Sequence, residues 1–460
     1  MISFPAPVSS ARLSYAAHAR SLLVLGLPLI GSNLAQMSLH VTDTIMLGWY
    51  GVPELAAVVL GSSYFFILFI LGSGFSYAVM GMVAQALGAG EEAQVRRDAR
   101  MGLWLSILFG VAVMPLMWAS GPILLALGQR PELAQLAQDY LRVGMWGMVP
   151  ALIIAVLKSY LSAQERTQVV MWVTLWGVVL NILANWALIF GNLGAPEMGV
   201  RGAALASVGV QISTSSLLLA YAAWAPALRK FHLLQRFWRP DWPAFVQVAR
   251  VGLPIGLASV SEAGLFQASA LMMGWIGTEQ LAAHGIALEL ASLTFMVHMG
   301  LSNAATVRVG RARGARDGAR LRDGALVAQL MSLVFGGVTV VLFLSQPELL
   351  IGLFLDMSNP AAPAILAFGA KLMVVAALFQ MFDSLQVMAL GLLRGVQDTR
   401  VPMWIAVASY WLVGIPASYV LAFPLGFGGV GLWLGLVIGL ACAGGFLILR
   451  FWRGPWLRAA

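Results

Sequence analysis

Four carboxylic acids interrupt otherwise apolar stretches of this sequence, where charged groups are rarely found. They are Asp43, Glu262, Glu289 and Asp383. An ionised carboxylate in hydrocarbon costs about 2.5 to 3.5 kcal/mol, so acids in such stretches usually face a cavity and act there. Because burial makes the charged form costly, such a group can exchange a proton near neutral pH, and its oxygens can also hold Na⁺. Either chemistry suits the coupling of an ion to the movement of a second molecule.

Other polar residues accompany these acids. His40 lies three residues before Asp43, which places both on one face of a helix. We expect His40 to be a neutral, packed histidine, and most amides to hydrogen-bond between helices. These amides are Asn33, Gln36, Asn181, Asn185, Gln267, Asn303, Gln380 and Gln386. Lys158 and Lys371 stand near the ends of apolar stretches, so we expect their ammonium groups to reach the membrane interface.

Membrane-crossing helices must position these residues. Of the 460 residues, 60% are hydrophobic and only 10% are charged, a composition that excludes an ordinary soluble domain. About twenty apolar residues are needed to cross some 30 Å of hydrocarbon, and runs of that length without strict alternation predict an all-α integral membrane protein. Twelve stretches qualify, near 22–45, 56–80, 100–124, 140–162, 169–191, 202–224, 248–272, 282–305, 324–346, 366–390, 403–424 and 430–452.

The positions of lysine and arginine predict the orientation of these spans. Of the 27 basic residues, 23 lie before the first span, after the last span or in the even-numbered connections. By the positive-inside rule, both termini are expected in the cytoplasm. The net charge of +8 therefore indicates topology, and we expect no nucleic-acid partner.

The two halves of the chain repeat each other. Residues 26–28 and 252–254 both read Gly-Leu-Pro, at an offset of 226 (252 − 26) that holds for about sixty residues. Six spans return the chain to the side where it began, so the repeats should form two bundles of the same sense that rock against each other. The predicted units are a first six-helix lobe at 1–224, a cytoplasmic linker at 225–247 and a second six-helix lobe at 248–460.

The acids do not follow this repeat. At the same offset Glu262 aligns with Gln36, and Asp43 aligns with Ser269. We therefore expect the lobes to have separate roles, with the coupling ion bound in one and substrate binding or protonation in the other.

Several segments resemble the multidrug and toxic compound extrusion family, in its NorM-like branch. They are 43–48 (Asp-Thr-Ile-Met-Leu-Gly), 252–254 leading to Glu262, 304–310 at the end of the eighth span, and Asp383 followed by 393–395 (Leu-Arg-Gly). The resemblance implies a V-shaped carrier of two pseudo-symmetric lobes that exports cationic, often aromatic compounds in exchange for H⁺ or Na⁺. By position, Glu262 and Asp383 would bind the coupling ion, as a metal site if it is Na⁺. Asp43 would be the proton- or substrate-linked acid of the first lobe.

The sequence departs from the family pattern at three positions. Phe379 stands where a tyrosine is common, His40 where glycine is common, and Glu289 where an amide is expected. The extra acid and the imidazole favour protons as the coupling ion, and Na⁺ stays open. These three residues are auxiliary site candidates together with the nearby amides Gln36, Gln380, Asn181 and Asn185.

Two other classes of function are disfavoured by the sequence. The sequence has no Gly-x-x-x-x-Gly-Lys-Ser/Thr loop for a nucleotide, and its five histidines are scattered, which argues against a primary pump and an intramembrane enzyme. The alternative is a flippase-type carrier of the same superfold for a lipid-linked or other amphiphilic cargo, which the near absence of mid-span Lys or Arg opposes. We expect a monomer in the lipid bilayer of a bacterial inner membrane, with small organic cations as partners and no cofactor.

Overall fold

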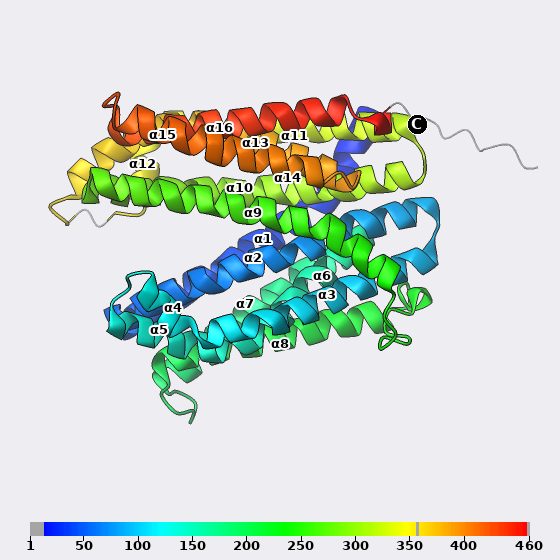
Figure 1. Ribbon diagram of the computed structural model, residues 1–460, viewed down its shortest axis with the longest axis horizontal. Coiled ribbons are helices and arrows are strands. Elements are labelled where there is room, and N and C mark those ends of the chain that lie inside the picture. Colours follow the sequence, from blue (N-terminus) through cyan, green and yellow to red (C-terminus); the bar gives the residue numbers. More distant parts are fainter. Residues whose placement is uncertain (1–12, 356–357, 458–460) are drawn as a thin grey trace, which may run out of the picture.

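The computed structural model of the chain describes residues 13–355 and 358–457. Within these ranges it is built from helices and contains no β-strand (Figure 1). Twelve helical segments of this described part are long and apolar enough to cross a membrane. The predicted all-α fold with twelve spans is therefore confirmed. Residues 1–12 and 458–460, the chain ends that the orientation prediction places in the cytoplasm, lie outside the described ranges.

The first half of the chain forms six spans, several of them longer than predicted. Their helices are α1 (Tyr15–Tyr50), α2 (Val52–Ala89), α3 (Glu92–Trp118), α5 and α6 (Pro131–Gly144 and Met148–Ala163), α7 (Thr167–Phe190) and α8 (Gly199–Trp224), with a short α4 (Ser120–Ala126) and the 3-10 turn η1 (Met145–Gly147). The 38 residues of α2 rise about 57 Å at 1.5 Å per residue. Such a helix continues beyond the hydrocarbon, and its more polar ends could not be predicted from hydropathy.

The second half forms the other six spans. Their helices are α9 (Trp242–Ile276), α10 (Thr278–Gly314), α11 (Gly318–Ser345), α13 (Ala362–Gly395), α14 and α15 (Arg400–Val407 and Ile415–Ala422) and α16 (Gly428–Trp452). A π-helical segment, η3 (Ala408–Gly414), joins α14 to α15. Short elements occupy the connections and the end, namely η2 (Arg229–Phe231), α12 (Pro347–Gly352) and η4 (Pro455–Leu457). Because α9 begins at Trp242, the linker predicted to end at 247 gives way to helix six residues earlier.

The two lobes converge towards the end that carries the C-terminus and diverge at the opposite end (Figure 1). Helices α1 and α9 each cross between the lobes. Helix α1 packs on α7 of its own lobe and on α10 and α11 of the second lobe, while α9 packs on α2 and α3 of the first lobe and on α14 and α16 of its own. A proline stands inside each helix at equivalent positions, Pro28 and Pro254, where the missing N–H interrupts the helical hydrogen bonds.

The backbones of α2 and α10 touch at the converging end. A Cβ atom added to Gly88 would lie 2.1 Å from the carbonyl oxygen of Arg311, and one added to Gly314 would lie 1.9 Å from that of Gln85. The same offset of 226 relates these two contacts, so the sequence repeat is also a repeat in packing. The Arg311 side chain adds an ion pair to Glu165 of the first lobe at 2.7 Å. Close glycine contacts and this ion pair hold the lobes together at this end.

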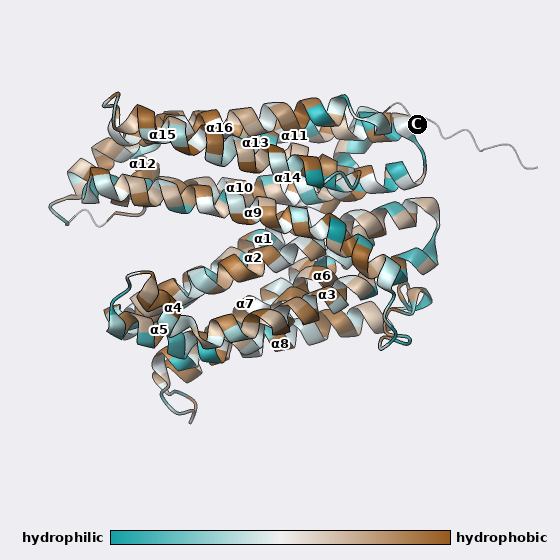
Figure 2. Cartoon of the chain, in the orientation of Figure 1, coloured by the Kyte–Doolittle hydropathy of each residue, from teal (hydrophilic) through white to brown (hydrophobic). Residues whose placement is uncertain are grey.

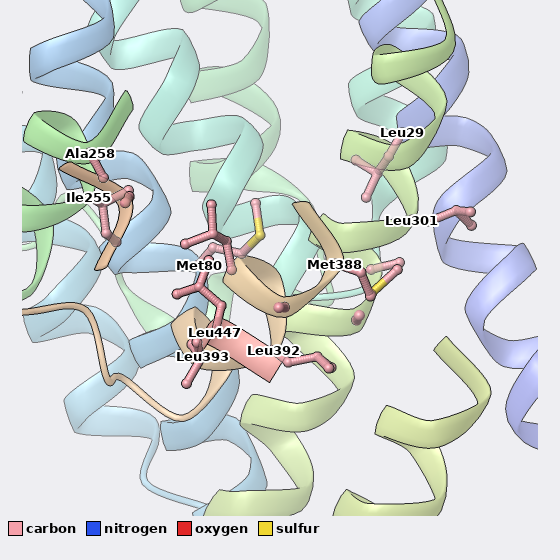
Figure 3. Close-up of a cluster of buried hydrophobic side chains, with 14 of the residues drawn as sticks. Leu29, Met80, Ile255, Ala258, Leu301, Met388, Leu392, Leu393 and Leu447 are labelled. Atoms are coloured by element: carbon pink, nitrogen blue, oxygen red, sulfur yellow. The ribbon is translucent and has the colours of Figure 1, made fainter. Parts of the chain in front are cut away.

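Apolar side chains both fill the interior and cover the outer surface. Figure 3 shows side chains of a buried cluster to which both lobes contribute, with Leu29 of α1 beside Leu301 of α10. Hydrophilic residues concentrate in loops and at helix ends (Figure 2). On α11, Val334, Val338 and Val341 form an outward stripe that is 61 to 67% exposed. Lipid requires such a surface, whereas water would disfavour it.

Candidate functional site

A cavity of about 260 Å³, the first-lobe cavity, lies among α1, α2, α5, α6 and α8. Asp43 lines it. Its Oδ1 atom accepts hydrogen bonds from Asn185 Nδ2 at 2.6 Å and from Asn181 Nδ2 at 3.1 Å. The two asparagines lie four residues apart on α7, so one helix face presents both amides to α1. The amides therefore hold the carboxylate in one orientation beside the cavity.

Three more polar side chains line the first-lobe cavity. Gln36 and His40 share the α1 face of Asp43 and are exposed to this space, so His40 is not packed as we expected. Lys158 of α6 donates from Nζ to Gln36 Oε1 at 3.0 Å and to Ser32 Oγ at 3.2 Å. The prediction that Lys158 reaches the membrane interface is therefore wrong, because oxygens of α1 hold its ammonium group inside the lobe.

The second-lobe cavity, of about 280 Å³, is lined by Glu262 of α9 and Asp383 of α13. Gln386 Nε2 donates to Glu262 Oε1 at 3.0 Å and also to the hydroxyl oxygen of Tyr410. The fold thus brings together the two acids that the family resemblance pairs. Among the described residues no third His, Cys, Asp or Glu joins them in a metal-binding cluster. A cation held here would take its other ligands from neutral oxygens.

Aromatic rings wall the second-lobe cavity around Asp383. Asp383 as a whole residue is only 2% exposed, and its carboxyl group has no hydrogen-bond partner within the described ranges. Phe379 and Phe266 line the same cavity with ring centroids 6.1 Å apart, and Phe379 lies 5.5 Å from Trp433. Two ionised carboxylates in such a space are strongly disfavoured without a cation, because their charges repel each other and little water screens them.

Two auxiliary candidates lie outside these cavities. Gln380 is fully buried in α13, and neither polar atom of its side chain has a hydrogen-bond partner within the described part of the chain. Glu289 is half-buried on α10 and is not among the residues that line either cavity. Gln380 and Glu289 are close to the acids in sequence, but their side chains point away from the two cavities.

A third cavity of about 290 Å³, the central cavity, lies between the lobes. It shares Gln36 and Lys158 with the first-lobe cavity and Glu262 with the second-lobe cavity, so it adjoins both. Arg394 of α13 also lines it, with its guanidinium carbon 4.7 Å from the ring centroid of Tyr77. Arg394 lies one residue before the end of α13, so it does not contradict the near absence of mid-span Lys or Arg. Arg394 had been assigned to a loop because the apolar stretch ends near 390, whereas α13 continues to Gly395.

Sequence analysis also missed Tyr410, which lies in the π-helical segment η3 and is fully buried. Segments of this kind occur frequently at functional sites, because they re-aim side chains within a helix. Between Ser409 and Trp411, the tyrosine resembles an aromatic residue of the membrane interface. The only available signal was a hydroxyl group near the middle of the eleventh span.

The MatE family model matches residues 28–187 and 254–420, two segments that start 226 residues apart (254 − 28), the offset of the internal repeat. The chain is 46% identical to a probable multidrug resistance protein NorM of Rhizobium meliloti, over 96% of this chain and 94% of that protein. It is 44% identical to a protein of the same name from Agrobacterium fabrum, over 96% of each.

Solved structures share the fold. The eukaryotic MATE transporter AtDTX14 superposes with a TM-score of 0.86 at 20% identity, over 97% of this chain and 98% of that one. An outward-facing multidrug resistance MATE family transporter of the MOP superfamily superposes with a TM-score of 0.85 at 22% identity, over 96% and 95%. Identities this low support the architecture alone. With the family match and the close relatives, they establish that this chain belongs to the MatE family of membrane transporters, in its NorM-like branch.

Proposed function

We propose that this transporter is a secondary antiporter that exports cationic, often aromatic drugs or toxic organic compounds in exchange for H⁺ or Na⁺. The observation that carries the proposal is the position of Glu262 and Asp383 in one cavity that adjoins the central cavity. A proton or Na⁺ bound there relieves the repulsion between the acids, and a cationic cargo competes through Glu262. Each species then lowers the affinity for the other, as exchange requires.

Alternating access follows from the arrangement of the lobes. They touch at the converging end through Gly88 and Gly314 and diverge at the other end (Figure 1). A rocking motion that separates the glycine contacts would open the central cavity towards the converging end. We place this end in the cytoplasm by the positive-inside rule, because the connections that follow α2 and α10 lie there with the other even-numbered connections, which hold most of the basic residues. We also place the protein as a monomer in a bacterial inner membrane.

The test is exchange in proteoliposomes that contain the purified full-length chain. Ethidium, a planar fluorescent cation, is loaded on one side, and a proton gradient or a Na⁺ gradient is imposed separately. We expect uphill ethidium movement with at least one gradient. Lack of movement with both gradients would overturn the proposed antiport.

The acids are tested in the same assay. Glu262→Gln and Asp383→Asn should each abolish gradient-driven transport, because the amides do not bind a proton and lack the negative charge that holds Na⁺. Glu279→Gln, at the exposed start of α10, is the matched control and should transport normally. Full activity in both cavity variants would remove the site assignment. A lipid-linked cargo is not proposed, since the relatives carry the name of multidrug resistance proteins.

A further inference from the structure

Helices α1 and α10 belong to different lobes and pack against each other. Asn33 Nδ2 of α1 donates to the backbone oxygen of Met296 on α10 at 3.2 Å. Nearer the converging end, a Cβ atom added to Gly300 would lie 2.5 Å from the side chain of Ile30, so the helices almost touch there. From one contact to the other, residue numbers rise along α1 and fall along α10. The two helices are therefore antiparallel, and these contacts fix their register.

Two ionisable side chains continue this register towards the diverging end. His40 lies seven residues after Asn33, and Glu289 lies seven residues before Met296. Seven residues make almost two helical turns, so each side chain lies on the same face as its contact residue, about 10 Å further along the helix. His40 is exposed and Glu289 is half-buried. Within the described part of the chain, neither side chain has a hydrogen bond or an ion pair.

The internal repeat places the equivalent residues across from each other on another helix pair. The offset of 226 relates His40 to Phe266 of α9 (266 − 40), and Glu289 to Ser63 of α2 (289 − 63). Phe266 and Ser63 line one cleft of about 370 Å³ between α2 and α9, which also belong to different lobes. Because the pair of α1 and α10 repeats the pair of α9 and α2, His40 and Glu289 should likewise face each other across the lobes.

We propose that His40 and Glu289 form an ion pair between the lobes that holds the diverging end closed. When the lobes rock and this end closes, α1 and α10 approach each other along the register that the Asn33 contact fixes. An imidazolium and a carboxylate then attract each other in a space from which most water is expelled. This inference rests on the alternating access proposed above and deepens it, because it names the residues that stabilise the second state.

The ion pair requires a protonated His40, so closure of the diverging end depends on pH. Histidine side chains change charge between about pH 5 and 8. Asp43 of the same helix, Tyr140 of α5 and Lys158 of α6 line the cavity that His40 faces, and Glu289 faces it from α10. The carboxylates of Asp43 and Glu289 favour the imidazolium, whereas the ammonium group of Lys158 opposes it. Protonation of His40 therefore stabilises the closed diverging end, and this stabilisation is lost as the pH rises.

Disulfide formation tests whether the two positions meet. The full-length chain with Cys442→Ala, His40→Cys and Glu289→Cys is placed in proteoliposomes, and copper phenanthroline supplies the oxidant. We expect a cross-link, because closure brings the two Cβ atoms to about 4 Å from each other. The matched control combines His40→Cys with Gly285→Cys, which is exposed, lies one helical turn out of register and should cross-link much less. No cross-link between positions 40 and 289, or an equal yield in the control, would overturn the inference.

Substitution of the two side chains tests the charges. At pH 6, His40→Gln and Glu289→Gln should each shift the lobes about fivefold towards the arrangement in Figure 1, the effect of one ion pair. Faster cross-linking of Gln85→Cys to Gln397→Cys, whose native side chains hydrogen-bond at the converging end, measures this shift. The double variant should shift the lobes no further, and all differences should vanish at pH 8. His232→Gln, at an exposed linker histidine, is the matched control. Additive shifts, or shifts that persist undiminished at pH 8, would overturn the ion pair.

Failure of this inference is distinguishable from failure of the proposed function. If proteoliposomes exchange ethidium for H⁺ or Na⁺ but positions 40 and 289 do not cross-link, the antiport stands and the ion pair falls. If the cross-link forms in register and responds to both charges while neither gradient moves ethidium, the ion pair stands and the antiport falls.

Discussion

The cavities of the two lobes occupy related positions in the repeat, yet they treat their acids in opposite ways. In the first lobe, Asp43 accepts hydrogen bonds from Asn181 and Asn185 beside an exposed His40. In the second lobe, Asp383 lies among aromatic rings without a hydrogen bond from any described residue. The repeat therefore preserves the helical scaffold while each lobe carries its own site chemistry.

This difference indicates which lobe binds the coupling ion and which lobe binds the cargo. Two fixed amide donors offset part of the cost of burying the charged Asp43 carboxylate, which can then attract an organic cation. Two carboxylates in an apolar enclosure need a proton or a metal ion to offset their repulsion. We infer that the second lobe responds to the ion, with Glu262 shared between ion and cargo, and that Asp43 of the first lobe adds to recognition of the cargo. Two predictions test this division of roles, and two others concern contacts between the lobes.

The largest effect is expected in the second lobe. Asp383→Asn should abolish gradient-driven export, a loss of at least about 100-fold, the upper range for coupling between two ligands, because one carboxylate alone no longer requires the ion. Asp43→Asn should instead weaken cargo binding and keep the response to the gradient. Ethidium transport with and without the gradient measures both variants. Equal loss of gradient response in the two variants would end the division of roles.

Equivalent substitutions at the glycine contacts of the two lobes should have equal effects, unlike equivalent substitutions of the acids. Gly88→Ala and Gly314→Ala each place a Cβ about 2 Å from a backbone oxygen. This clash should cost about 2 kcal/mol, which shifts the equilibrium between touching and separated lobes roughly 30-fold towards separation. The measurement is cross-linking of Gln85→Cys to Gln397→Cys, whose native side chains lie 2.5 Å apart across the lobes. Both alanine variants should lower the yield alike, while Gly285→Ala, with no atom near its Cβ, should not. A normal yield in either glycine variant would contradict the prediction.

Removal of one amide should affect only the first lobe. Asn185→Ala deletes the shorter hydrogen bond to Asp43, which is expected to cost about 1.5 kcal/mol, or roughly tenfold in ethidium affinity. The Na⁺ or H⁺ dependence should stay that of the wild type. Asn192→Ala, in the α7–α8 loop, serves as the control in the same binding titration. A change in ion dependence without a change in affinity would reverse the roles of the lobes.

The smallest effect concerns a contact that anchors α9 on the first lobe outside the membrane. Arg97 hydrogen-bonds to Asp241, and this bond holds the pKa of the Asp241 carboxyl below its usual range. Because the folded pKa is lowered, the stabilisation is present above about pH 4, the usual aspartate range, and is lost as the pH falls through the lowered pKa.

Thermal unfolding can detect this contact. Asp241→Asn keeps a helix-capping side chain and should lower the free energy of unfolding by at most about 1 kcal/mol at pH 7. The difference from wild type should shrink towards pH 3. Asp317→Asn is the matched control, since Asp317 caps α11 through the Arg320 N–H at 2.9 Å. A loss that is equal at both pH values would exclude the ion pair as its cause.

Much of the architecture was readable from the sequence because its signals are local or periodic. A bilayer demands apolar runs of fixed length, which predicted the twelve spans. The repeat of Gly-Leu-Pro at 26–28 and 252–254 predicted two lobes, and the same offset reappears in the contacts of Gly88 and Gly314. A charged group such as the Glu262 carboxylate has a high free energy in lipid, so an acid in the middle of a span is a site candidate from sequence alone.

The tertiary structure decided which side chains meet. Lys158 lies near a helix end, and hydropathy alone cannot distinguish an ammonium group at the membrane interface from one held by Gln36. Tyr410 contacts Gln386 only because η3 turns it into the second lobe. The pocket around Asp383 likewise depends on how α9 and α13 face each other across the second-lobe cavity. Insertion into lipid is decided residue by residue, whereas a site depends on the rotation and packing of helices far apart in the chain.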